Sequence, residues 1–191
     1  MKQIYIVLTR TGTVLSTIIR GFTRDEYTHV SISLDKKLNK MYSFGRLNPY
    51  NPFIGGFIRE YINKGTFKRF KNTKTLILEL NIENEQYKKI EEIIKYFEKN
   101  KEKFTFNVKG MFLSAIDVKV RKRKSFYCAQ FVKHLLDRAG IKNEIQDTVR
   151  PENFKELEKT KIIYEGLLRK YNHKKIKLYI GERKKVVKVT V

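Results

Sequence analysis

One stretch of the chain alternates strictly between apolar and polar side chains, and a second strand-like stretch follows it. In THVSISLD (residues 28–35) the three apolar residues share one face of a strand, while His29, Ser31 and Ser33 share the other. The polar residues 35–39 suit a turn, and KMYSFGR (residues 40–46) suits the returning strand. The pattern therefore predicts a β-hairpin inside an antiparallel sheet.

The remaining segments predict a mixed α+β order. Further strands are expected at residues 2–8, 57–62 and 75–82, and three closing strands at residues 161–170, 174–181 and 184–191. Residues 48–56, with two of the chain's three prolines and a glycine pair, are expected to form a loop.

Helical spacing of apolar residues accounts for most of the other segments. Helices are expected at about 13–22, 83–99, 107–118 and 127–139, with a short one starting near Pro151. Gly140 suits the position just after the fourth helix. Strands, helices and again strands in one chain indicate an α+β fold.

Composition bounds the class of protein. With 191 residues, 41% of them hydrophobic, the chain is long enough for a single domain, residues 1–191, with a real core. One cysteine excludes an internal disulfide, and one cysteine with three histidines disfavours a structural zinc site. No metal or cofactor is therefore predicted.

The charge balance points to anionic partners. The net charge is +22, which favours nucleic acid, an anionic membrane surface or an acidic substrate without choosing among them. No run approaches the roughly 20 apolar residues that span a bilayer, and no secretory signal is apparent. The expected location is the cytoplasm, with peripheral contact to an anionic membrane surface as an addition.

The only cysteine, Cys128, stands near the start of the fourth predicted helix. It belongs to an apolar stripe of that helix, so the thiol can be a small buried hydrophobe. The start of a helix also carries free N–H groups and partial positive charge, which stabilise a thiolate and an oxyanion. The helix alone leaves both interpretations open.

A thiol nucleophile needs a base, and His29 is the best placed of the histidines. It begins the alternating strand on its polar face. His134 lies about 240° around the helix from Cys128, and His173 stands in a polar, basic turn. A strand-start histidine with a helix-start cysteine forms the minimal Cys–His pair of a thiol hydrolase.

A third group should orient the imidazole. On the returning strand Tyr42 and Phe44 suit the apolar face, which leaves Ser43 on the face of His29. Ser43 is thus the candidate third residue. An ordinary polar strand residue is the alternative interpretation.

The segments YTHVSISLD, MYSFGR, FYCAQFVKHLLDRAGI and VRPENF, in this order, resemble the circularly permuted NlpC/P60 group of papain-like proteins. In that group the histidine strand precedes the cysteine helix, as it does here. The matching segments span about residues 5–155. The resemblance implies a papain-like fold, in which an antiparallel, barrel-like sheet packs against the helix that carries Cys128.

The resemblance also implies roles. Cys128 would be the nucleophile, His29 the base, and a polar residue on the strand after His29, here best fitted by Ser43, the third member. Family members often carry a more strongly polar group at that place. The family contains amidases, peptidases and lipid-directed acyl hydrolases or transferases.

The predicted function is therefore a thiol hydrolase or acyltransferase acting on an amide or ester through an acyl-enzyme. Substrates in keeping with the charge are a peptide, a cell-wall fragment or an anionic lipid. The basic run KVRKRKS, just before Cys128, suggests a basic rim beside the site or a solvated loop. The alternatives are an inactive papain-like module and a module that binds nucleic acid or an anionic membrane, although no nucleic-acid motif is present.

Overall fold

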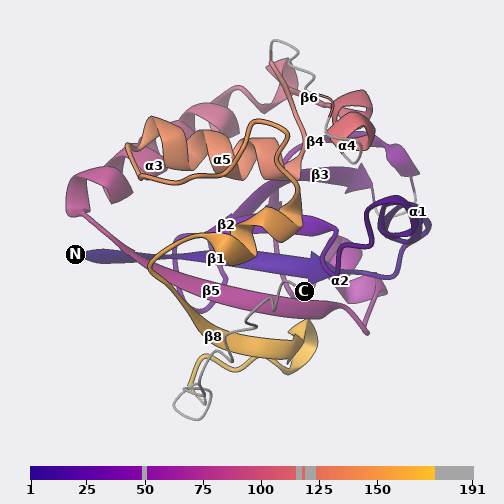
Figure 1. Cartoon of the computed structure of the whole chain (residues 1–191), viewed down its shortest axis with the longest axis horizontal. Coiled ribbons are helices and arrows are strands. Elements are labelled where there is room, and N and C mark those ends of the chain that lie inside the picture. Colours follow the sequence, from indigo (N-terminus) through magenta and orange to yellow (C-terminus); the bar gives the residue numbers. More distant parts are fainter. Residues whose placement is uncertain (49–50, 115–117, 119–123, 175–191) are drawn as a thin grey trace, which may run out of the picture.

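The computed structural model describes residues 1–48, 51–114, 118 and 124–174. It is an α+β structure with a mostly antiparallel sheet (Figure 1). The sheet strands are β1 (Lys2–Arg10), β2 (His29–Ser33), β3 (Met41–Asn48), β4 (Asn51–Glu60), β5 (Lys74–Ile82) and β8 (Thr160–Leu167). The helices are α1 (Val14–Thr23), α2 (Gly65–Arg69), α3 (Asn84–Lys99), α4 (Val108–Ser114) and α5 (Cys128–Arg138).

The six strands are ordered β4-β3-β2-β1-β5-β8, and every neighbouring pair is antiparallel. The predicted hairpin of residues 28–46 is confirmed, because β2 pairs with β3 in a register that places Ile32 opposite Tyr42. Two short strands, β6 (Thr105–Phe106) and β7 (Ser125–Phe126), form a separate parallel pair. In the six-stranded sheet, β2 lies in the interior, between β1 and β3.

Helices α3 and α5 lie side by side along one face of the sheet (Figure 1). Between them and the sheet lies the larger apolar cluster of the protein, in which Phe97 of α3 packs against the rings of Phe57 and Phe131 at 5.6 and 5.3 Å between centroids. A smaller cluster covers the opposite face. Burial of these apolar faces holds α5 in a fixed place over β2 and β3.

Local signals mark where α1 begins and where α5 ends, close to the predicted positions. The Thr13 hydroxyl accepts from the Ser16 N–H at 3.1 Å and caps α1. Gly140 follows α5 with a φ of 70°, a left-handed conformation that favours glycine. The segment near Pro151 is a 3₁₀ helix, Pro151–Glu156, which confirms a short helical element there.

The structure differs from the predictions at the glycine- and proline-rich segment. The expected loop of residues 48–56 is wrong over most of its length, because β4 begins at Asn51. Gly55 and Gly56 are tolerated in this edge strand because other backbone lies close to it there. Of the three closing strands, the first is confirmed as β8, and the other two lie outside the described residues apart from Lys174.

Candidate active site

Cys128 is the first residue of α5. The preceding Tyr127 is buried, and its hydroxyl donates to the carbonyl of Val149 at 2.8 Å, which fixes the entry into the helix. Phe131 is the first residue of the helix whose N–H donates to the carbonyl four residues earlier, that of Tyr127. The N–H of Cys128 therefore has no partner within its helix, as at any helix start.

His29 begins β2 and faces Cys128. The chain just before it is held by two bonds, from the Thr28 N–H to the Thr9 carbonyl at 3.1 Å and between the Thr28 and Ser16 hydroxyls at 2.7 Å. The side chains of His29 and Cys128 line the same pocket, and the interaction with the Cys128 side chain is among the causes that raise the pKa of His29. The structure thus brings together the cysteine and the histidine that the sequence singled out, although 99 positions separate them.

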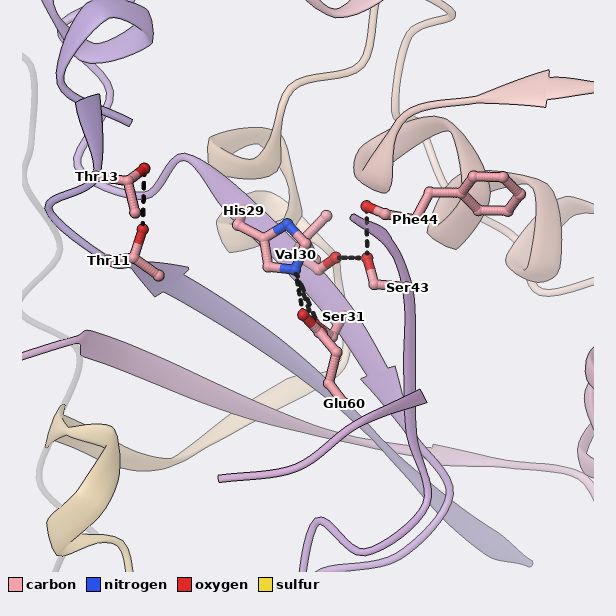
Figure 2. A network of polar contacts seen from close by, with 8 residues as sticks. All are labelled: Thr11, Thr13, His29, Val30, Ser31, Ser43, Phe44 and Glu60. Atoms are coloured by element: carbon pink, nitrogen blue, oxygen red, sulfur yellow. Dashed lines mark hydrogen bonds and ion pairs between the residues drawn. The ribbon is translucent and has the colours of Figure 1, made fainter. Parts of the chain in front are cut away.

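A carboxylate lies against one nitrogen of the imidazole (Figure 2). The two oxygens of Glu60, the last residue of β4, lie 3.1 and 3.3 Å from His29 Nε2. A carboxylate only accepts hydrogen bonds, so Nε2 carries the proton of this pair, and Nδ1 is the ring nitrogen that does not contact Glu60. The Ser31 hydroxyl donates to the same carboxylate and lies 3.3 Å from His29 Nε2.

The electrostatics favour a charged imidazole. Burial lowers the pKa of His29, but the neighbouring Glu60 carboxylate and the interactions of the imidazole with Cys128 and Glu60 outweigh it and raise the pKa to about 10. His29 is therefore an imidazolium at neutral pH. An imidazolium beside a thiol is the arrangement that stabilises a thiolate.

Ser43 is not placed as predicted. It is fully buried on β3, and its hydroxyl donates to the Val30 carbonyl at 2.7 Å rather than to His29 (Figure 2). The predicted face was right, but the position along the strand was not. Extending the β2–β3 register from Ile32 and Tyr42 sets Ser43 across from Ser31, and Gly45 across from His29.

Glu60 is the residue that the sequence reasoning missed. It lies beyond the neighbouring strand, on β4, so a search confined to the strand next to His29 cannot find it. Gly45 contributes no side chain between them, and a Cβ there would come within 3.6 Å of the imidazole. The signal available in the sequence was the lone carboxylate at the end of FIRE, and the structure shows that it is buried, with 9% of the residue exposed.

Cys128, His29 and Glu60 line one pocket of about 70 Å³. Thr11, Thr13, Ser16 and Thr28 contribute hydroxyls to the same pocket. Apolar walls come from Phe44, Phe67, Phe106 and Met111, and a cation comes from Arg46. His134 instead packs against the rings of Phe97 and Phe126.

The described residues contain no group of three or more His, Cys, Asp or Glu side chains that could hold a metal ion. None of the helices described is long and apolar enough to cross a membrane. Most of the basic run before Cys128, residues 119–123, lies outside the described residues. Comparisons of the chain with protein-family models, with curated proteins and with solved structures found no match.

Proposed function

We propose that the protein is a thiol hydrolase or acyltransferase that acts on an amide or ester bond. The observation that carries the proposal is the line of side chains from the Cys128 thiol through the His29 imidazole to the Glu60 carboxylate. Nucleophile, base and orienting group are the three parts that covalent acyl transfer requires. Glu60 takes the role of the third member.

The first half of the reaction forms an acyl-enzyme. The Cys128 thiolate attacks the carbonyl carbon, and the backbone N–H of Cys128 donates to the oxyanion that develops. The tetrahedral intermediate then collapses. The bond to the amine or alcohol breaks, and the leaving group takes a proton from the His29 imidazolium.

The second half releases the acyl group. His29, now neutral, takes a proton from a water molecule or from an acceptor alcohol or amine, which attacks the thioester carbonyl. The carbon–sulfur bond breaks, and the thiolate and the imidazolium are restored. Glu60 stays ionised throughout and holds the imidazole in the orientation that presents Nδ1 to the thiol.

The arrangement of the elements supports a permuted papain-like fold for this site. The strand that carries the base, β2, precedes the helix that carries the nucleophile, α5. That helix packs across β2 and β3, beside the histidine. The net charge of +22 favours substrates that are acidic or that lie at an acidic surface in the cytoplasm.

Acylation by p-nitrophenyl acetate tests the proposal directly. We expect a burst of p-nitrophenol, together with one acetyl group on Cys128 in the mass spectrum of the intact protein. Cys128→Ala should abolish both, and His29→Ala should slow the burst by at least about 100-fold, the usual size of a general-base contribution. His173→Ala serves as the matched histidine control. A burst that survives Cys128→Ala, or equal rates for the two histidine variants, would overturn the proposal.

A further inference from the structure

The pocket of the thiol contains a cation that the reaction above does not use. Arg46 of β3 lines the pocket beside Cys128. One of its guanidinium nitrogens donates to the Thr13 hydroxyl at 2.7 Å. Within the described part of the chain no carboxylate forms an ion pair with Arg46. A guanidinium has five N–H donors, and the bond to Thr13 is the one that the described part of the chain gives Arg46.

The surroundings of Arg46 favour a negative charge. Burial lowers the pKa of Arg46, and the positive charge of Arg69 lowers it further, so a bound anion would relieve the repulsion between the two. The helix α1 begins directly after Thr13, which adds the positive end of its dipole. Among the described residues that line the pocket, the one carboxylate is that of Glu60, which is already bound to His29 and Ser31.

We propose that Arg46, together with the hydroxyl groups of Thr11 and Thr13, binds an anionic group of the acyl substrate next to the bond that Cys128 attacks. This inference rests on the proposed function, because it names the substrate class of the same site. The substrate is an amide or ester with a carboxylate or a phosphate close to its reacting carbonyl. The small size of the pocket keeps that distance short, since cation and thiol line the same 70 Å³.

The guanidinium suits this task better than an ammonium would. Its planar fork donates two parallel hydrogen bonds to a carboxylate or a phosphate. The bond to Thr13 holds the fork in place before the ligand arrives. A neutral substrate would leave the cation without a negatively charged partner, and this disfavours neutral acyl compounds.

Two alkylating reagents of nearly the same shape test the inference at Cys128 itself. Iodoacetate carries a carboxylate beside its reactive carbon, and iodoacetamide carries a neutral amide there. We expect Arg46→Gln to lower the ratio of the iodoacetate rate to the iodoacetamide rate by about tenfold, the size of one charge-assisted contact. The rate ratio of Arg46→Lys should lie between that of the wild type and that of Arg46→Gln.

Arg59→Gln is the matched control. It removes the same charge from the exposed end of β4, where Arg59 bonds to the Asn39 carbonyl and does not line the pocket. The rate ratio should be unchanged in this variant. An equal fall of the ratio in both variants would show a general effect of net charge and would overturn the inference.

A second readout does not depend on a reactive thiol. At constant ionic strength, inorganic phosphate or acetate should raise the Tm of the wild type and of Arg59→Gln more than that of Arg46→Gln. The anion that raises the Tm more shows whether a phosphate or a carboxylate is the preferred group. Anion stabilisation that needs Arg46 in a protein with an inert thiol would contradict the proposed function and would leave Arg46 as an anion-binding residue without an acyl substrate. Stabilisation that is independent of Arg46 would contradict the inference alone.

Discussion

At the scale of single residues, the site depends on how His29 is charged. Its imidazole interacts with both Glu60 and Cys128, and only a fifth of its side chain is exposed. Little water therefore screens the attraction between the imidazolium and the carboxylate. Removing one partner of such a pair leaves the other charge without compensation, which makes the pair sensitive to conservative changes.

Replacing Glu60 by glutamine removes the negative charge and keeps the shape of the side chain. We expect the pKa of His29 to fall from about 10 toward its ordinary value, because burial then acts with much less opposition. An NMR titration of the His29 ring measures this directly. The matched control is Glu165→Gln, an exposed glutamate of β8. A pKa of His29 that is the same in the two variants would show that Glu60 does not hold the charge.

The same pair makes the free energy of unfolding depend on pH. The pKa of His29 is raised on folding from 6.5 to about 10, so its stabilisation is fully present below pH 6.5. It is lost as the pH rises through about 10. Urea unfolding at pH 6 and at pH 10 should show a larger loss of stability in the wild type than in His29→Gln. An equal loss of unfolding free energy between pH 6 and pH 10 in the two proteins would contradict the stabilising role of the His29 charge.

At the scale of elements, the pocket depends on how closely β4 approaches β6. A Cβ on Gly55 would lie 2.8 Å from the Gly45 carbonyl oxygen and 2.9 Å from the Phe106 side chain. Phe106 is itself one wall of the pocket. The absence of a side chain at position 55 therefore lets the backbones of β3 and β4 and the Phe106 side chain meet.

Gly55→Ala should destabilise the protein by about 1–3 kcal/mol, because neither the β3 backbone nor the Phe106 ring can yield freely. Gly21→Ala is the control. Gly21 lies in α1 with nothing within 4 Å of its added Cβ, and this variant should gain about 1 kcal/mol from helix propensity. Thermal and urea unfolding of the two variants give the difference. Equal stability would show that the contact at Gly55 is loose.

The elements also show what could be predicted from the sequence. The hairpin of β2 and β3, the helix α3 and the start of α5 at Cys128 follow from periodicity and caps, which are local signals. The partner of His29 is not a local property. It depends on a glycine that leaves room and on the order of strands, which sets the predicted strand at residues 57–62 beside β3. For this reason Ser43 was predicted where Glu60 is found.

At the scale of the whole molecule, the net charge of +22 is the dominant feature. Like charges repel more strongly in the compact state than in the unfolded chain. Added salt screens this repulsion, with a Debye length that falls to about 10 Å at 0.1 M. The urea midpoint should therefore rise when sodium chloride is increased from about 0.02 to 0.3 M. A midpoint that falls would mean that attractive ion pairs outweigh the repulsion.

The central claim is that Cys128 and His29 form an activated pair. The pH dependence of Cys128 alkylation by iodoacetamide, in the wild type and in His29→Ala, tests it most directly. We expect the wild-type thiol to be alkylated faster at neutral pH than the thiol of His29→Ala, because an imidazolium beside a thiol favours the reactive thiolate, and we expect loss of His29 to change the pH profile. A thiol that reacts only when the protein unfolds, or a profile that ignores His29, would identify Cys128 as an ordinary core residue.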